Sequence, residues 1–473
     1  MQARVAASAA MRQGLHVAQI HFSRALLAAG WRTDVLLTLD GRTIAGIEAG
    51  VPAPAAAEKI SGIALPGMPN VHSHAFQHAM AGLTERHGPE DDSFWTWREV
   101  MYRFLAQMTP DDIEAVAAMA YVEMLETGLT TVGEFHYLHH APDGARYSDP
   151  AETAGRIVAA AATSGIGLTL LPCFYAHGGC GGRPAKPAQA RFLSDLDSFV
   201  GLVEASRRHV ASLEGARLGI APHSLRAVDA SELRALAKAF GSGPIHIHAA
   251  EQALEVEECL AWSGARPVQW LLDNLGLDER WCLIHCTHMT LDEIGGLVRS
   301  GAVAGLCPIT ESNLGDGIFA AVEFERAGGR FAIGTDSNVR IAVNEELRTL
   351  EYSQRLRDQK RNRLGAPGAS TGRAIFDAAR TGGAQALALG PVGVACGLAV
   401  GQPADIVVLD DAHPSLACRT DDAALDAWIF AAGEVAREVF AGGRRVVTGG
   451  RHVRAEEVRR RYAATMERLL QHA

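Results

Sequence analysis

Between Pro66 and Leu389, short apolar stretches alternate with stretches of helical period, and this alternation constrains the fold more than any other feature of the sequence. Strands that alternate with helices predict a parallel sheet, because each helix returns the chain to the same edge of the sheet. Eight such strands are predicted, at Met68–His74, Thr130–Tyr137, Gly167–Tyr175, Arg217–Ser224, Pro244–Glu251, Trp281–His288, Ala302–Thr310 and Phe331–Ser337.

Helical stretches lie between most of these strands and follow the last of them. They are predicted at Pro110–Glu126, Ala151–Ala162, Ala190–Leu213, Ala230–Ala239, Leu291–Val298, Glu345–Arg363 and Gly372–Leu389. Eight strand–helix units of this kind predict an α/β fold, a (β/α)8 barrel of the TIM type. A doubly wound open sheet is the alternative, but it favours a glycine-rich phosphate loop after the first strand, and the sequence has none there.

Both ends of the chain are rich in short strands. Asp40–Gly41, between two apolar runs, predicts a hairpin near the start, and Ala404–Leu409 and Val435–Val447 predict strands near the end. We expect these ends to form one small β-sandwich domain, residues 1–65 and 396–454, interrupted by the barrel at residues 66–395. The segment 455–473 is predicted to be a C-terminal helix, from the amphipathic run Ala455–Leu470.

Composition narrows the class of protein. The 473 residues are 48% hydrophobic and 21% charged, which is ordinary for a globular enzyme, and the net charge of −10 argues against a nucleic-acid partner. The eight cysteines form no CxxC pair, the first 20 residues make a poor signal peptide, and no run of about 18 apolar residues predicts a membrane span. We therefore expect a cytoplasmic protein that acts on a small molecule, with no nucleic-acid or membrane partner.

Histidine and aspartate fall at the ends of several predicted strands. His72 and His74 lie two residues apart on the first strand, so their side chains share one face and can bind one divalent ion. His248, His285 and Asp336 end later strands. In a barrel of this type the C-terminal ends of the strands form the active face, so these residues are candidates for one metal site.

With these residues in place, the chain resembles the amidohydrolase superfamily over nearly its whole length. The matching stretches are the HSH triplet, IHIHAAE, GTDSN and GQPADIVVLD. The resemblance implies one divalent ion, most simply Zn²⁺, because the fourth strand has no lysine that could bridge two metals. It implies His72, His74, His248 and Asp336 as the metal ligands. His246 shares a strand face with His248 and is the alternative ligand, but the HxxE spacing to Glu251 favours His248.

The resemblance also implies hydrolysis, since an ion bound in this way can lower the pKa of water to about 7. Asp336 would accept a proton from the attacking water, Glu251 would deliver one to the leaving nitrogen, and His285 would hydrogen-bond the attacking oxygen. The alternative for Glu251 is a carboxylate that only orients a neighbour or lies at the surface.

Longer stretches resemble one group within the superfamily, the N-formimino-L-glutamate deiminases. These enzymes hydrolyse N-formimino-L-glutamate to N-formyl-L-glutamate and ammonia in histidine degradation. The matching stretches are VHSHAFQHAMAGLTER, DSFWTWREVMY, TTVGEFHYLHH, APHSLRAV, TESNLGDGIF and NEELRTLEYSQRLRDQKRN. This resemblance implies that Arg98 and Arg226 grip the substrate carboxylates, because guanidinium binds carboxylate in a bidentate manner. Gln77, Tyr137 and His223 are implied as further substrate-binding residues, and a homodimer is expected, with Glu345–Arg363 packing on a neighbour.

Two parts of the sequence leave their roles open. After Asp336 the chain reads Ser-Asn-Val-Arg, where the resemblance predicts a histidine and a small residue, so the roles of Asn338 and Arg340 are undecided. The insert His177–Pro187 is rich in glycine and proline and predicts either a lid or an ordinary long loop.

Two other functions compete with this interpretation. A related deaminase acting on a nucleobase or another cyclic amidine would need aromatic stacking and amide contacts more than two arginines. A non-catalytic scaffold would have no physical need for the full set of ligands and proton carriers.

Overall fold

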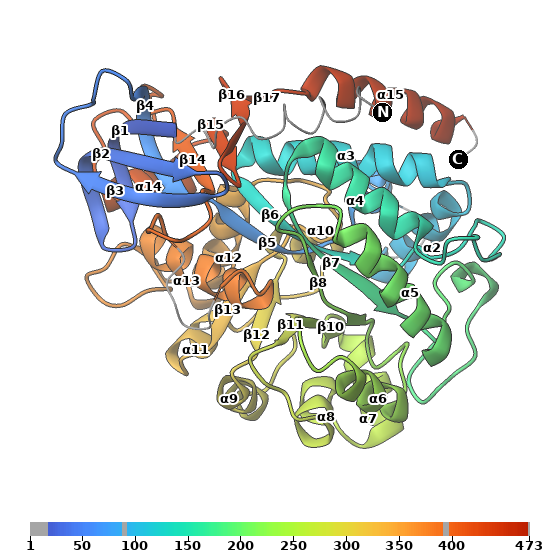
Figure 1. Ribbon diagram of the computed structural model, residues 1–473. Helices are drawn as coiled ribbons and strands as arrows, with labels where there is room; N and C mark the ends of the chain where they lie inside the picture. The colour runs from blue at the N-terminus through green and yellow to red at the C-terminus, as the bar shows by residue number, and fades with distance from the viewer. Residues whose placement is uncertain (1–17, 88–91, 391–396, 472–473) are drawn as a thin grey trace, which may run out of the picture.

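The computed structural model describes residues 18–87, 92–390 and 397–471 (Figure 1). A sheet built from both chain ends lies beside a larger body of parallel strands and helices. Residues 1–17 of the predicted sandwich and the predicted domain edge at residues 395–396 lie outside the described residues.

The two ends of the chain form one mixed sheet of eight strands, ordered β17-β16-β15-β14-β4-β1-β2-β3. Its strands are β1 Ala18–Leu27, β2 Gly30–Asp40, β3 Thr43–Ala49, β4 Glu58–Pro66, β14 Ile406–Leu409, β15 Ala436–Ala441, β16 Arg444–Thr448 and β17 Arg451–His452. The last N-terminal strand pairs antiparallel with the first C-terminal one, so Leu65 lies opposite Val407. The predicted hairpin is also confirmed, because β2 and β3 are antiparallel partners on either side of Asp40–Gly41. The predicted union of the two ends is therefore confirmed.

The larger part contains two groups of parallel strands, which confirms the predicted parallel pairing. One group has the order β5-β6-β7-β8, with β9 beside β7, and the other has the order β10-β11-β12-β13. Their bounds are β5 Met68–Ser73, β6 Leu129–His136, β7 Gly167–Phe174, β8 Arg217–Leu218, β9 Ala221–Pro222, β10 Ile245–Ala249, β11 Trp281–His285, β12 Val303–Leu306 and β13 Arg330–Ile333. Single parallel bridges join the groups, from Ser73 to Asp336 and from Ile220 to Ile245.

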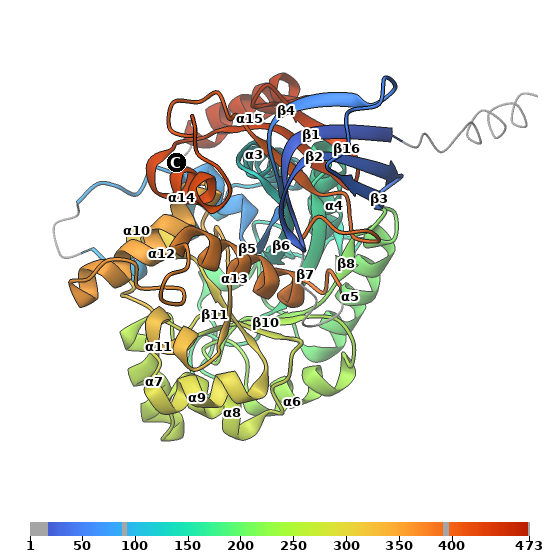
Figure 2. The ribbon, with the colours of Figure 1, turned by 90° about the vertical axis from the view of Figure 1, so that its left-hand side faces the viewer.

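Helices lie around the outside of these strands (Figures 1 and 2). They are α3 Pro110–Thr127, α4 Glu152–Ser164, α5 Leu196–Val210, α6 Ala230–Ala239, α7 Ala253–Ser263, α8 Pro267–Asn274, α9 Leu291–Ser300, α11 Ala321–Arg326, α12 Val343–Asp358 and α13 Thr371–Ala386. Helix α3 shows how the sequence sets these bounds. The Thr109 side chain caps its first turn, Pro110 takes the first helical position, and Gly128 ends it in the left-handed conformation (φ 98°).

Several elements differ from prediction at their ends. The strand predicted to reach Thr310 stops at Leu306, because Pro308 begins a short helix, α10 (Pro308–Leu314). The helix predicted from Ala190 begins at Leu196, after Asp195 caps its first turn. Some further elements were not predicted at all: the helices α2 (Phe94–Leu105), α7, α8, α11 and α14 (Asp422–Ala431), and the 3-10 helix η1 (Ala75–Met80).

The C-terminal helix α15 (Ala455–Leu470) has the predicted bounds. It lies along α3, at the top of Figure 1, and ion pairs fix it there: Arg461 pairs with Glu114 at 3.0 Å, and Arg459 with Glu126 at 3.1 Å. None of the helices in the described ranges is long and apolar enough to cross a bilayer.

Candidate active site

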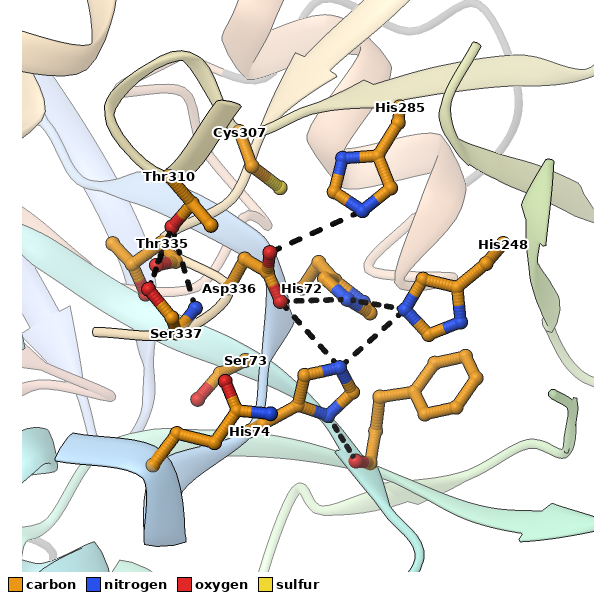
Figure 3. A network of polar contacts seen from close by, with 12 residues as sticks. His72, Ser73, His74, His248, His285, Cys307, Thr310, Thr335, Asp336 and Ser337 are labelled. Atoms are coloured by element: carbon orange, nitrogen blue, oxygen red, sulfur yellow. Dashed lines mark hydrogen bonds and ion pairs between the residues drawn. The ribbon is translucent and has the colours of Figure 1, made fainter. Parts of the chain in front are cut away.

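Four predicted metal ligands converge at the C-terminal ends of the parallel strands. Asp336 Oδ1 lies 3.4 Å from Nε2 of His72 and 3.4 Å from Nε2 of His74. His248 Nε2 lies 3.1 Å from His72 Nε2 and 3.4 Å from His74 Nε2. Figure 3 shows these side chains pointing toward one another from β5 (His72), from the residue directly after it (His74), from β10 and from the loop after β13. The structure thus brings these four side chains together, and all four are buried.

The hydrogen bonds behind two of these rings determine their tautomers. His74 Nδ1 lies 2.8 Å from the main-chain oxygen of Phe135, and His248 Nδ1 lies 3.0 Å from that of His223. A carbonyl oxygen only accepts, so each Nδ1 carries the proton. Burial lowers the pKa of both rings, which keeps them neutral. The two Nε2 atoms therefore present lone pairs to each other, an arrangement that fits a cation between them.

The backbone at these strand ends is unusual. Ala250 (φ 53°), His285 (φ 71°), Asp336 (φ 45°) and Asn338 (φ 55°) all occupy the left-handed region, which non-glycine residues rarely adopt. Each such residue costs on the order of 1–2 kcal/mol and persists only where its surroundings hold it. This conformation turns the chain sharply at the ends of β10 and β11, which explains why these two strands end before their predicted limits. The strand β13 already ends at Ile333, and Asp336 and Asn338 turn the loop that follows it.

The segment after Asp336 has a structural part in the site. Asn338 is buried, and its side-chain amide donates to Ser73 Oγ at 3.2 Å and to the main-chain oxygen of Asp336 at 3.0 Å. It thereby ties the Asp336 turn to the HSH triplet. Arg340 points elsewhere, since its guanidinium pairs with Glu345 and Glu434.

Glu251 and His285, the predicted proton carrier and hydrogen-bond donor, lie beside the four ligands. Glu251 is buried, with Oε1 3.7 Å from His285 Nε2, and burial raises the pKa of its carboxyl. Burial lowers the pKa of His285, but Glu251, Glu311 and Asp336 outweigh it and raise that pKa to about 10. His285 Nδ1 lies 3.2 Å from Glu311 Oε1, so its Nε2 is directed toward Glu251 and Asp336. For Asp336, burial raises the pKa, but the hydrogen bond and charge of His72 hold it well below its usual range.

A cavity of about 410 Å³ opens above these groups. All five predicted substrate-binding residues line it: Gln77, Arg98, Tyr137, His223 and Arg226. Gln77 Nε2 donates to the Tyr137 hydroxyl at 2.9 Å, and the His223 ring packs against Tyr175 with centroids 4.6 Å apart. Part of the insert 177–187 also lines the cavity, through Gly178, Gly179, Arg183, Pro184 and Lys186.

The two predicted carboxylate-binding arginines differ in their surroundings. Arg98 Cζ lies 4.5 Å from the ring centroid of Trp95, a cation–π contact. Within the described ranges, no acidic side chain lies within ion-pair distance of Arg98. Arg226 is buried, and its Nη2 lies 3.2 Å from Glu251 Oε2.

Two histidines on the strands, His246 and His136, lie outside the site. His246 Nε2 donates to the main-chain oxygen of Ala386 at 2.8 Å, at the end of α13, so its ring is engaged away from the four ligands. His136 Nε2 lies 3.0 Å from Thr153 Oγ1, on the helix side of β6.

Comparison with known proteins places the chain in a family. Residues 63–446 match the amidohydrolase family. The chain belongs to this family. Over 95% of its length it is 50% identical to the formimidoylglutamate deiminase of Pseudomonas aeruginosa, 99% of which is covered. It is 28% identical to a 5-methylthioadenosine/S-adenosylhomocysteine deaminase of Natronomonas pharaonis, over 83% of each chain. The crystal structure of an amidohydrolase from Brucella melitensis superposes with a TM-score of 0.92 at 50% identity, covering 96% of this chain and 100% of that one.

Two buried carboxylates beside the site of this amidohydrolase were missed from the sequence. Glu311 contacts His285, and Glu255 accepts a hydrogen bond from the main-chain N–H of Glu251 at 3.0 Å. Glu311 lies in TESN, directly after the seventh predicted strand, and this position was the available signal. Glu255 lies one helical turn after Glu251, on α7, a helix that was not predicted.

Proposed function

We propose that this protein hydrolyses N-formimino-L-glutamate to N-formyl-L-glutamate and ammonia, a step of histidine degradation. The observation that carries the proposal is the presence of two guanidinium groups, Arg98 and Arg226, in the cavity above the converging ligands. A substrate with two carboxylates and a formimino head requires this pairing of cations with a hydrolytic centre. The 50% identical relative named formimidoylglutamate deiminase supports the same assignment.

We propose that His72, His74, His248 and Asp336 hold one divalent ion, Zn²⁺. The facing lone pairs of His74 and His248 and the nearby Asp336 oxygen fit such an ion, because each of these atoms is a common zinc ligand. When bound, the ion would act as a Lewis acid and lower the pKa of water to about 7.

Three side chains would move and hold the protons. Asp336 Oδ2 would accept a proton from the attacking water. The imino nitrogen needs two protons to leave as ammonia: Glu251 would deliver one as the water oxygen adds to carbon, and Asp336 would pass on the one it took from the water. The proton left on the added oxygen would return to Glu251 as that oxygen becomes the formyl oxygen. His285, held through Nδ1 by Glu311, would donate from Nε2 to the oxygen that adds to carbon. Proton transfer by positioned groups of this kind typically contributes about 10²–10⁴-fold in rate.

Arg98 and Arg226 would each bind one substrate carboxylate, and Gln77, Tyr137 and His223 would line the carbon chain between them. The Gln77 side-chain oxygen is buried without a partner in the described part of the chain, so it is available to a substrate N–H. A ring-shaped substrate would use aromatic faces for stacking, and the guanidinium of Arg98 already lies over one of those in the cavity lining, Trp95.

The decisive assay measures ammonia release from N-formimino-L-glutamate and, in parallel reactions, from guanine, cytosine, adenosine and 5′-methylthioadenosine. The metal content is measured on the same preparation. We expect release from the formimino compound alone, with about one zinc per chain. Turnover of a nucleobase or nucleoside without release from N-formimino-L-glutamate would replace our assignment with the cyclic-amidine alternative.

We also propose that the parallel strands close into one (β/α)8 barrel, residues 66–395, inserted into a small sandwich of residues 1–65 and 396–454, followed by the helix 455–473. The single bridges from Ser73 to Asp336 and from Ile220 to Ile245 support closure. A crystal structure with continuous pairing between the two strand groups would establish it, whereas a gap on either side would mean an open sheet.

Finally, we propose a homodimer that uses α12. Its outer face exposes Leu356 by 79% and Tyr352 by 39%, which suits contact with a second copy better than contact with water. Sedimentation of the protein and of Leu356→Glu tests this: the variant should shift toward monomer, and a monomeric parent protein would contradict the proposal.

A further inference from the structure

Arg226 lies between two buried carboxylates. Its Nη2 is 3.2 Å from Glu251 Oε2, and its Nε is 3.9 Å from Glu255 Oε1. All three side chains are buried. One buried cation is therefore already surrounded by two acidic groups before any substrate carboxylate arrives, and one of those groups is the proposed proton carrier.

The two acidic partners are held unequally. Glu255 Oε2 accepts a hydrogen bond from the main-chain N–H of Glu251 at 3.0 Å, so this carboxylate is fixed by the backbone. Among the described residues, the Glu251 carboxylate forms ion pairs only with Arg226 and the His285 ring. Glu251 is thus the partner that a third anion can displace.

The position of Arg226 decides which substrate carboxylate it meets. Its partner Glu251 lies 3.7 Å from His285, beside the reacting centre. In N-formimino-glutamate only one nitrogen and one carbon separate the formimino carbon from the α-carboxylate, whereas the γ-carboxylate is two methylene groups further away. The α-carboxylate therefore reaches Arg226, and the γ-carboxylate extends toward Arg98.

We propose that the α-carboxylate of the substrate competes with Glu251 for Arg226, so that its binding frees Glu251 to turn toward the leaving nitrogen. This inference rests on the proposed function. Recognition of the α-carboxylate then becomes a condition for the chemical step as well as for binding. Arg226 acts through Glu251 in this respect, and it makes the enzyme specific for α-carboxylated formimino compounds.

Two truncated substrates test the coupling in the unmodified enzyme. N-formimino-4-aminobutanoate lacks the α-carboxylate, and N-formimino-L-2-aminobutanoate lacks the γ-carboxylate. We expect the first to lose about tenfold or more in kcat, and the second to raise KM with kcat nearly kept, because only the first leaves Glu251 paired. Added formate should fill the empty carboxylate position and restore kcat for the first compound alone.

A variant gives the converse result. Arg226→Met should raise KM for the full substrate, yet turn over N-formimino-4-aminobutanoate with a higher kcat than the parent enzyme, because Glu251 is no longer held. Arg98→Met is the matched control, since Arg98 has no acidic partner in the described chain, and it should give no such gain. If Arg226→Met does not fold, because it leaves Glu251 and Glu255 buried without a cation, the formate experiment still decides.

The outcomes separate the two proposals. One result overturns the coupling and leaves the proposed function standing. In it, N-formimino-L-glutamate is turned over normally, while the α-truncated compound shows a higher KM with unchanged kcat and no effect of formate. No ammonia from N-formimino-L-glutamate overturns both. A loss of kcat that formate reverses supports the coupling, because a purely structural role of Arg226 would not respond to a free carboxylate.

Discussion

The Nε2 atoms of His74 and His248 lie 3.4 Å apart, and the Nδ1 proton of each ring is donated to a main-chain oxygen. Two neutral imidazoles in this state face each other with lone pairs and share no proton. Asp336 Oδ1 lies 3.4 Å from His74 Nε2, so a carboxylate charge and two nitrogen lone pairs face one another. A bound cation would balance them.

Metal removal should therefore abolish activity and lower stability. We expect dialysis against a chelator to stop ammonia release, and about one equivalent of Zn²⁺ to restore it. Because the ion binds the folded protein, its loss should also lower Tm, by an amount that grows with the free Zn²⁺ concentration used for comparison. Calorimetry with and without Zn²⁺ measures this effect.

A matched pair of variants tests whether His248, and not His246, binds the metal. His248→Gln should lose most of the bound zinc. His246→Gln should keep it, because a glutamine can still donate to the main-chain oxygen of Ala386, which is the contact that His246 makes. Equal zinc content in the two variants would contradict the placement of His248 in the site.

A second prediction concerns Glu134, which is fully buried below the HSH triplet and accepts from the Ala75 N–H at 2.7 Å. Burial raises the pKa of this carboxyl from 4.5 to about 7. Between these pH values the folded protein keeps a proton that the unfolded chain releases, so the free energy of unfolding falls as pH rises. The stability that depends on protonated Glu134 is fully present below pH 4.5 and is lost as the pH rises through 7. This loss of unfolding free energy amounts to at most about 3 kcal/mol.

Glu134→Gln keeps a side-chain oxygen for the Ala75 N–H but cannot ionise. We expect the parent protein to lose more stability than this variant between pH 5 and pH 8, as measured by urea unfolding at each pH. Parallel losses in the two proteins would show that Glu134 does not titrate in this range.

Much of the fold was accessible from sequence because apolar runs and caps act locally. Helices α6 and α15 have the predicted bounds, and α3 extends only to Thr127, where Gly128 ends it. Helix α2 was missed because its sequence, FWTWREVMYRFL, is rich in aromatic residues that are typical of strands, although Ser93 caps its first turn.

Only part of the candidate site could be predicted from the sequence. The positions of His72, His74 and Asp336 follow from strand ends, which is a local property. The pairing of Arg226 with Glu251 does not, since it depends on how two loops fold over the sheet. The same holds for Glu311, which contacts His285 only because α10 begins directly after β12.

A third prediction tests Arg98 as a carboxylate-binding residue. Arg98→Met should raise KM for N-formimino-L-glutamate by roughly 10–100-fold, because a hydrogen bond to a charged group is worth about 1.5–3 kcal/mol. Bound zinc should not change. Arg340→Gln is the control, since Arg340 pairs with Glu345 and Glu434 outside the cavity, and its KM should stay near that of the parent. Loss of zinc in Arg98→Met would mean that Arg98 supports the metal site.

The last prediction concerns Asn338, whose buried side chain holds the turn that carries Asp336. Its amide nitrogen donates to Ser73 Oγ and to the Asp336 main-chain oxygen, and its amide oxygen accepts from Thr335 Oγ1 at 2.6 Å. The backbone here is left-handed, with φ 55°. Two substitutions separate these contributions, because Asn338→Gly removes the side chain but suits this φ, whereas Asn338→Ala removes the side chain and adds strain.

We expect both variants to lose about 2–4 kcal/mol of unfolding free energy through the lost hydrogen bonds, and Asn338→Ala to lose about 1 kcal/mol more than Asn338→Gly. Zinc affinity should fall in both, since Asp336 is no longer tied to Ser73. Urea unfolding of the metal-free proteins measures the first effect, and a zinc competition titration measures the second. Equal stability of the two variants would show that the left-handed backbone is unstrained, and an unchanged Kd would show that Asn338 supports the fold without positioning Asp336.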